Sequence, residues 1–316
     1  MRDDSSPRAG ADEIISLALA GLTSEPKTLP PKLFYDQAGC ALFYRITQLP
    51  EYYLTRTEVG LLRELAPSVA ALTPGPAVLV EYGASDETKA RLLLGQAQFT
   101  AYVPVDVNAN ALAGMVRRVS KPAGLRVLPL VADFTAPVVL PAAVSGLARF
   151  GFFPGSTIGN LDPEEARRFL RQARTTLGAG AWMLVGVDLL KDAAVLTAAY
   201  NDSAGITAAF NRNLLVRLNR ETGADFDVES FAHRAIWNPE QSRIEMHLVS
   251  TRAQTVRVAG RAIRFARGET IHTENSYKYS REGFARLADP AGWRSVDLWT
   301  DAAELFSVHL LQAPIG

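Results

Sequence analysis

The sequence predicts an α/β protein in which an open, mostly parallel, doubly wound sheet is joined by a second α+β lobe. Three observations predict this. Apolar runs alternate with helical segments from Ala77 to Asp188, as expected for strands buried on both faces between crossover helices. Residues 191–280 abandon that alternation. The chain of 316 residues is also longer than one hydrophobic core usually grows.

The alternating region contains the elements of the predicted sheet. Before this region the sequence predicts a short helix at Glu13–Gly21 and a second helix at Thr55–Ala71. The proline pair Pro30-Pro31 lies between them and favours an extended or turn conformation. The predicted strands are Ala77–Tyr82, Ala101–Asp106, Leu125–Asp133, Ala148–Pro154 and Trp182–Asp188. The predicted helices between them are Asp86–Gln96, Ala109–Ser120 and Pro163–Leu177, the last with Gly178 just past its end.

The second lobe and the end of the chain follow. A long helical region, Ala193–Glu221, leads to β-type segments between Ser242 and Phe265. The chain then returns to a helix at Arg281–Ala288. The final strands, Arg294–Thr300 and Leu305–Gln312, are joined by too few residues for a parallel crossover, so we expect an antiparallel pair.

Composition narrows the class of partner. Lys plus Arg and Asp plus Glu both number 33, which gives a formal charge of zero. Nucleic-acid and anionic-membrane binding proteins usually carry a basic excess or patch, so neither partner is expected. Met1–Gly10 is polar and no apolar run is long enough for a membrane helix, so we expect a soluble protein that is not exported.

The cysteine and histidine counts bear on compartment and metal. Cys40 is the single cysteine, which favours a reducing cytoplasm, and its apolar surroundings predict a buried packing residue. The four histidines show no metal-ligand spacing along the chain, so no metal is expected.

Small and acidic residues follow the strand ends, where α/β sheets bind ligands. Gly83 ends the first strand, and Asp106 ends the second about 20 residues later, where a carboxylate reaches ribose hydroxyls. Asp133-Phe134 ends the third, and Gly155-Ser156 follows the fourth. Together they predict a nucleoside cofactor, either S-adenosylmethionine (SAM) or NAD. The absence of G-x-G-x-x-G and Walker spacing disfavours a dehydrogenase and a kinase.

Several longer phrases are more specific. The chain resembles the L-histidine Nα-methyltransferases of ergothioneine biosynthesis in the segments Leu29–Asp36, Leu49–Arg56, Gly155–Leu161, Ala204–Asn213, Ile244–Met246 and Thr273–Ser276. The resemblance implies a class I SAM-methyltransferase sheet, Rossmann-like and mostly parallel with an antiparallel C-terminal strand. It also implies an amino-acid-binding domain of residues 1–57 and 191–280, and a SAM domain of residues 58–190 and 281–316.

The resemblance also implies site residues. The SAM contacts are Tyr35, Gly83, Lys89, Asp106, Asp133, Phe134, Gly155 and Ser156. The amino-acid contacts are Tyr52, Asn160, Tyr200, Met246, Glu274 and Ser276. One departure is the first loop, which usually reads G-S-G in the family and here reads Gly83-Ala84-Ser85.

These assignments predict roles. Asn160 and Tyr52 would hold the amine, although Asn160 is alternatively the cap of the helix near Pro163. Glu274 and Ser276, two apart on a strand, share one face and would pair with the two imidazole nitrogens, while Met246 packs against the ring. The expected product is trimethylhistidine (hercynine), made by a cytoplasmic monomer. A methyltransferase for tryptophan or another aromatic amine, a non-catalytic SAM-binding regulator and an NAD-dependent oxidoreductase remain open.

Overall fold

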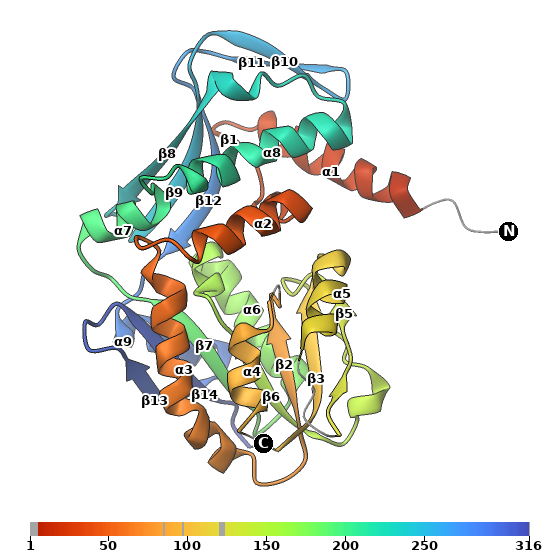
Figure 1. The fold of residues 1–316 in the computed structure, drawn as a ribbon, viewed down its shortest axis with the longest axis vertical. Helices are drawn as coiled ribbons and strands as arrows, with labels where there is room; N and C mark the ends of the chain where they lie inside the picture. Colours follow the sequence, from red (N-terminus) through yellow and green to blue (C-terminus); the bar gives the residue numbers. More distant parts are fainter. Residues whose placement is uncertain (1–5, 85, 97, 120–123, 316) are drawn as a thin grey trace, which may run out of the picture. The chain divides into compact units, whose positions relative to one another are not determined.

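A computed structural model describes residues 6–84, 86–96, 98–119 and 124–315 (Figure 1). It divides into two compact units. Unit 1 comprises Met1–Tyr52 and Asp192–Ser276, and unit 2 comprises Tyr53–Lys191 and Tyr277–Gly316. The sequence-based division places the corresponding boundaries at residues 57, 190 and 280, a few residues from these.

Unit 2 is built on one sheet with the strand order β13-β14-β7-β6-β2-β3-β4, and β5 also pairs with β3. The strands from β2 to β7 pair in parallel, whereas β14 is antiparallel to both of its neighbours. This is the predicted Rossmann-like sheet of the class I methyltransferases. Its strands are β2 (Ala77–Tyr82), β3 (Phe99–Asp106), β4 (Arg126–Val127), β5 (Leu130–Val131), β6 (Ala148–Phe153), β7 (Trp182–Asp188), β13 (Arg294–Thr300) and β14 (Phe306–Gln312).

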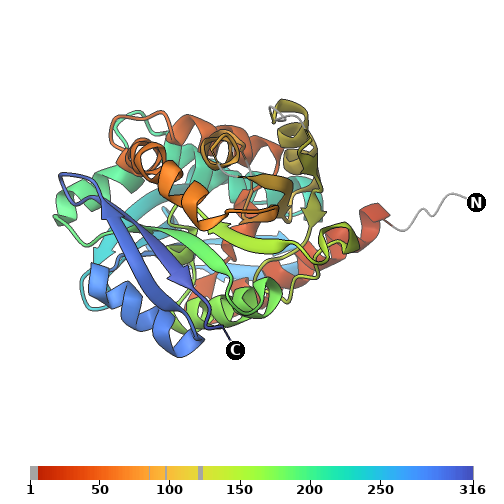
Figure 2. The same cartoon turned by 90° about the horizontal axis from the view of Figure 1, so that it is seen from below.

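Helices cover both faces of this sheet. Figure 2 shows α3 and α4 on one face and α6 and α9 on the other. Every residue of β2 is buried as a result, which explains its unbroken apolar sequence. The helices are α3 (Tyr53–Leu72), α4 (Thr88–Leu94), α5 (Ala109–Arg118), α6 (Pro163–Leu177) and α9 (Arg281–Ala288).

The core of unit 2 lies between the sheet and α6 and α9. Phe153 of β6 packs on Phe169 of α6 with ring centroids 4.3 Å apart. Trp293 is 1% exposed, and its indole N–H donates to the carbonyl of Leu170 at 2.8 Å, so the largest core side chain leaves no polar group unpaired. The core therefore holds the carboxyl ends of β2 and β6 in fixed positions.

Unit 1 packs helices against a smaller sheet with the order β1-β12-β9-β8, and β10 and β11 form a separate antiparallel hairpin. Its strands are β1 (Lys27–Thr28), β8 (Phe231–Asn238), β9 (Arg243–Ser250), β10 (Gln254–Val258), β11 (Arg261–Phe265) and β12 (Thr270–Tyr277). Its helices are α1 (Ser6–Leu22), α2 (Gln37–Ile46), α7 (Ala193–Tyr200) and α8 (Ile206–Thr222).

Helix α1 begins at Ser6, earlier than the predicted Glu13, and two other predicted elements are interrupted. Leu125–Asp133 forms the two short strands β4 and β5 instead of one strand, because Pro129 between them has no N–H for a strand ladder. Ala193–Glu221 is broken into α7 and α8. Gly205 adopts φ +71° at the break, and the Asp202 carboxylate accepts from the first amides of α8.

Other features escaped the sequence reading. Helix α2 was not predicted, although Asp36 caps it by accepting from the Gly39 N–H at 2.7 Å. Cys40 on this helix is half-buried, whereas the sequence predicted a buried residue. None of the helices in the described ranges combines the length and apolarity needed to cross a membrane.

Candidate functional site

Three loops of unit 2 converge at the carboxyl ends of the parallel strands. Gly83 follows β2 with φ +74°, and its N–H donates to the carbonyl of Val105 on β3 at 2.9 Å. A Cβ on Gly83 would lie 3.7 Å from the Phe134 ring and 3.9 Å from the Thr157 methyl group. The loops after β2, β5 and β6 therefore face one another at the predicted cofactor site.

A buried acid lies directly beneath the first loop. Glu81 of β2 accepts a short hydrogen bond from the Tyr102 hydroxyl of β3. Burial raises the pKa of Glu81 to about 8, against the opposing effect of that hydrogen bond. Burial thus favours the protonated form of this carboxyl group. Ser85, the departure in the first loop, lies outside the described residues.

Two of the predicted aspartates lie near the ends of neighbouring strands, Asp106 as the last residue of β3 and Asp133 two residues after β5. Asp106 ends β3 and accepts from the N–H of Asn108 at 2.7 Å, while burial raises the pKa of its carboxyl group. Asp133 accepts from both the N–H and the hydroxyl of Thr135, at 2.9 and 2.5 Å. Each carboxylate is thus oriented by its own following loop. Phe134 is held edge-on to Phe153 and Phe169, with centroids 5.3 and 5.7 Å away.

The loop after β6 turns sharply. Gly155 has φ +80° and Ser156 has φ +56°, so two successive residues are left-handed. Hydrogen bonds to other elements fix both residues. The Gly155 N–H donates to the Glu58 carboxylate at 2.9 Å, and the Ser156 hydroxyl accepts from the Asp188 N–H at 2.9 Å. Lys89 lies beside them, its ammonium 2.6 Å from Glu58.

Asn160 closes the turn Thr157–Asn160 that follows. The sequence left open that Asn160 caps the next helix, but Asp162 does so. Its carboxylate accepts from the amides of Glu164 and Glu165, and the Glu165 side chain returns to the Asp162 N–H. Capping α6 therefore does not account for Asn160.

This arrangement fits a SAM-like nucleoside. The Gly83 loop permits close backbone approach, Asp106 offers a carboxylate to ribose hydroxyls, and Phe134 offers a ring edge or face to a base. Lys89 provides a cation for a carboxylate. Unit 2 thus groups most of the predicted cofactor residues. Tyr35 belongs to unit 1, where its ring packs edge-on against Phe43 and Phe210.

Three of the predicted amino-acid contacts lie together in unit 1. The hydroxyl groups of Tyr200 and Ser276 are hydrogen-bonded at 2.7 Å, joining the end of α7 to β12. The Tyr52 ring packs edge-on to Tyr200 with a centroid distance of 6.3 Å. All three side chains are at most 7% exposed. Buried polar groups are normally hydrogen-bonded, and they either stabilise the fold or bind a specific ligand.

The other two predicted contacts of unit 1 lie on neighbouring strands: Glu274 on β12, the strand of Ser276, and Met246 on β9. Glu274 of β12 is 7% exposed and Met246 of β9 is 2% exposed. The Thr273 hydroxyl donates to the Met246 carbonyl at 3.0 Å, so the two strands are tied together next to Glu274. The burial alternation along β12 is interrupted at Thr273 and Glu274, which are both buried. Glu274 and Ser276, two residues apart on β12, are both buried.

Comparison with known proteins decides which family these residues belong to. The model of a family described as histidine-specific, SAM-dependent methyltransferases matches residues 14–313. The chain belongs to this family.

Curated relatives of this SAM-dependent methyltransferase are named for histidine methylation or for ergothioneine biosynthesis. The histidine N-alpha-methyltransferase of Mycolicibacterium smegmatis is 42% identical over 92% of both chains. That of Mycobacterium tuberculosis is 39% identical over 92% of both chains. Ergothioneine biosynthesis protein 1 of Neurospora crassa is 31% identical over 90% of this chain and 33% of its own length.

The methyltransferase also contains a buried ionic cluster that sequence reasoning missed. Asp188, at the end of β7, accepts from the Tyr53 hydroxyl at 2.8 and 2.9 Å. The ammonium groups of Lys191 and Lys278 lie 2.6 and 2.7 Å from the same carboxylate. Burial lowers the pKa of Lys191 to about 8. The only sequence signal was an acid at a strand end, the same signal that identified Asp106.

A second missed cluster lies in unit 1. Glu245, His247 and His272 place potential ligand atoms within 4.8 Å of one another, an arrangement their spacing along the chain concealed because they come from two strands. Asn238 and Arg243 both donate to Glu245 at 2.9 and 2.8 Å, and His247 lies 3.1 Å from its other oxygen. The carboxylate is thus already engaged by a cation.

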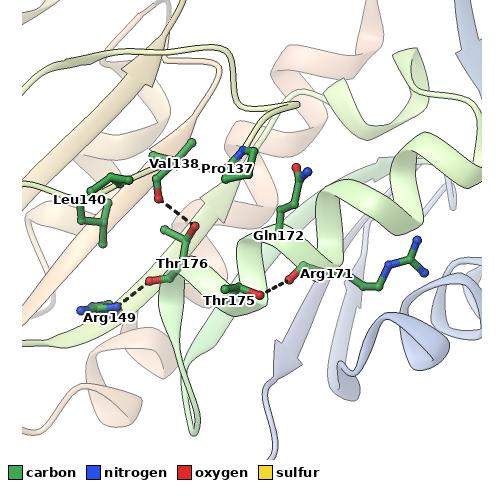
Figure 3. A pocket seen from close by; sticks show the side chains of 9 residues that line it. Pro137, Val138, Leu140, Arg149, Arg171, Gln172, Thr175 and Thr176 are labelled. Carbon is green, nitrogen blue, oxygen red and sulfur yellow. Dashed lines mark hydrogen bonds between the residues drawn. The ribbon is translucent and has the colours of Figure 1, made fainter.

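A surface pocket of about 560 Å³ lies in unit 2 between Pro137–Leu140 and α6 (Figure 3). Thr176 donates to the Val138 carbonyl at 3.1 Å and Arg149 donates to the Thr176 carbonyl at 2.6 Å across its floor. None of the predicted cofactor or substrate residues lines this pocket. It is therefore separate from the converging strand-end loops.

Proposed function

We propose that this enzyme transfers methyl groups from SAM to the α-amino nitrogen of L-histidine, three in succession, and so makes hercynine for ergothioneine biosynthesis. Membership of the histidine-specific family carries the proposal. The hydrogen bond between Tyr200 and Ser276, two of the predicted histidine contacts, supports it, because it preassembles part of a polar amino-acid site.

In this proposal unit 2 holds SAM. Gly83, Lys89, Asp106, Asp133, Phe134, Gly155 and Ser156 bind it, together with Tyr35 of unit 1. When bound, SAM supplies an electrophilic methyl group on a sulfonium, so the protein contributes orientation and desolvation rather than covalent chemistry.

The amine is positioned by two residues. The amide oxygen of Asn160 accepts a hydrogen bond from the α-amine, and the Tyr52 hydroxyl provides the second contact. An acceptor on the N–H groups leaves the nitrogen lone pair available for attack. Each transfer forms a positively charged ammonium, and loss of its proton to water restores a neutral amine with one N–H fewer. Dimethylhistidine in its neutral form therefore still presents its lone pair for the third transfer, which gives the quaternary ammonium. Bulk water takes the amine proton before binding.

The imidazole is recognised in unit 1. Glu274 accepts from one ring nitrogen, and the Ser276 hydroxyl pairs with the other. A serine hydroxyl rotates freely unless a partner fixes it, and the Tyr200 hydroxyl at 2.7 Å is that partner. Met246 packs against the ring. A site built for two ring nitrogens leaves buried groups unpaired with other rings, which costs roughly 10⁴-fold or more in discrimination.

Mass spectrometry of products from pure protein, SAM and L-histidine tests the proposal. We expect histidine carrying one, two and then three methyl groups, ending as the trimethyl form. Accumulation of monomethylhistidine alone would contradict successive transfer. Consumption of tryptophan but not histidine would replace the substrate while leaving the family assignment intact.

We further propose that the enzyme acts in the cytoplasm as a monomer. A zero formal charge and a single cysteine support a small-molecule enzyme of a reducing compartment. Light scattering coupled to size-exclusion chromatography checks the monomer, since a dimer doubles the measured mass.

A further inference from the structure

Glu58 is a fully buried glutamate whose carboxylate contacts two of the predicted cofactor residues of unit 2, Lys89 and Gly155. It projects from α3, far from these loops in sequence, and is 0% exposed. No motif in the sequence marked it. Its contacts show what it does.

The carboxylate binds two groups at once. Both oxygens lie 2.9 Å from the Gly155 N–H, and Oε2 also lies 2.6 Å from the Lys89 ammonium. Lys89 and Gly155 come from different elements, the start of α4 and the loop after β6. Charge-assisted hydrogen bonds of this kind are about twice as strong as neutral ones.

The surrounding backbone is shaped to admit this carboxylate. Gly186 of β7 lies against it, and a Cβ there would fall 2.1 Å from Oε1. Gly155 in turn has a left-handed φ, and a Cβ there would fall 3.4 Å from the Lys89 ammonium. Two glycines therefore leave room for the contact between Glu58, Lys89 and the loop.

We propose that Glu58 is a positioning residue for the SAM site, acting through Lys89 and the Gly155 amide. A lysine has many rotamers, and fixing its ammonium with a buried carboxylate leaves its remaining N–H bonds aimed in one direction. The same carboxylate fixes the left-handed turn that carries Ser156. This inference rests on the proposed SAM contacts of Lys89 and Gly155.

Glu58→Gln tests it, with S-adenosylhomocysteine affinity measured by calorimetry. Glutamine keeps the volume of the side chain and an oxygen that accepts from the Gly155 N–H, but it removes the negative charge that pairs with the Lys89 ammonium. We expect affinity to fall about tenfold or more, since hydrogen bonds to charged groups are worth that much. The KM for SAM should rise while the Kd for histidine and the melting temperature change little.

Glu64→Gln is the matched control. Glu64 lies on the same helix as Glu58, α3, but is exposed and belongs to none of the cofactor loops. This variant should bind S-adenosylhomocysteine as the wild type does. Equal losses in Glu58→Gln and Glu64→Gln would overturn the proposal, since they indicate a general effect of charge.

A double-mutant cycle with Lys89→Met separates positioning from structure. If Glu58 acts through Lys89, the double variant should lose scarcely more affinity than Lys89→Met alone. Additive losses would overturn the proposal, and so would unchanged affinity in Glu58→Gln. A wild type that binds no S-adenosylhomocysteine would instead contradict the proposed function, which distinguishes the two failures.

Discussion

At the scale of single residues, the functional candidates fall into two classes. Some, such as Gly83 and Asp106, follow from a strand end and were visible in the sequence. Others, such as Glu58 and Asp188, are acids whose partners lie on other elements. Burial of a carboxylate and its contacts with distant elements leave no pattern in the local sequence, so only the structure reveals the second class.

Glu274→Ala tests histidine recognition at this scale. Removal of a carboxylate that accepts from the imidazole should lower kcat/KM for histidine about 100-fold, the upper end for a hydrogen bond to a charged group. Affinity for S-adenosylhomocysteine should be unchanged. Steady-state kinetics and calorimetry measure the two effects. Glu240→Ala, an exposed glutamate of the same unit, is the control, and equal losses of histidine use and cofactor affinity would contradict the role.

Asp188→Ala tests the buried cluster. Removing this fully buried carboxylate deprives two ammonium groups of a partner, so the free energy of unfolding should fall by about 3–5 kcal/mol. Urea denaturation measures it. Exposed Glu282→Ala, on α9 of the same unit, should leave the midpoint unchanged. A similar small shift in both variants would show that the cluster contributes little.

At the scale of elements, boundaries set by a local backbone preference were predicted accurately, whereas interruptions within an element were not. Pro163 and Gly178 bound α6 as expected, because each has a local backbone preference. The strand expected over Leu125–Asp133 divides around Pro129, and the helix expected over Ala193–Glu221 breaks before Gly205. Apolar runs identify an element but do not register where its hydrogen-bonded ladder is interrupted.

Asp162→Ala tests the element that follows Asn160. Losing the reciprocal cap of α6 should cost about 1 kcal/mol and lower the melting temperature by about 2–4 °C. Differential scanning calorimetry measures this. Asp162→Ser should restore most of the loss because serine also caps helices. If the alanine variant melts like the wild type, the cap is not a determinant of stability.

At the scale of the whole molecule, the chain forms two compact units, each drawing on segments distant in sequence. The last two strands of unit 2, β13 and β14, follow the second segment of unit 1 in the sequence. The sheet of unit 2 is therefore complete only when β14 pairs with β7 and β13 pairs with β14. His309 lies in β14 within that sheet, and burial lowers its pKa to about 3. This links the stability of the chain to pH.

His309 is neutral in the folded protein, whereas in the unfolded chain it binds a proton near pH 6.5. Between pH 3 and pH 6.5 the unfolded state therefore binds more protons than the folded state. The free energy of unfolding consequently falls as the pH drops below about 6.5. His309 alone should cost roughly 2 kcal/mol between pH 7 and pH 5. His309→Phe should reduce the pH dependence of urea unfolding by that amount, and an identical dependence in both proteins would contradict the assignment.

The amino-acid sequence was enough to predict the class of sheet, the antiparallel C-terminal pair and the family, because alternating apolar runs and short motifs depend on local order along the chain. It also placed Gly83, Asp106, Gly155 and Asn160 at strand ends. The tertiary structure alone decided that Glu58 reaches Lys89 and Gly155, that Asp188 gathers two lysines, and that Tyr200 meets Ser276. Apart from the pair of Asp188 and Lys191, which are three residues apart, each of these contacts joins residues separated by long stretches of chain. Only the packing of the core brings them within hydrogen-bonding distance.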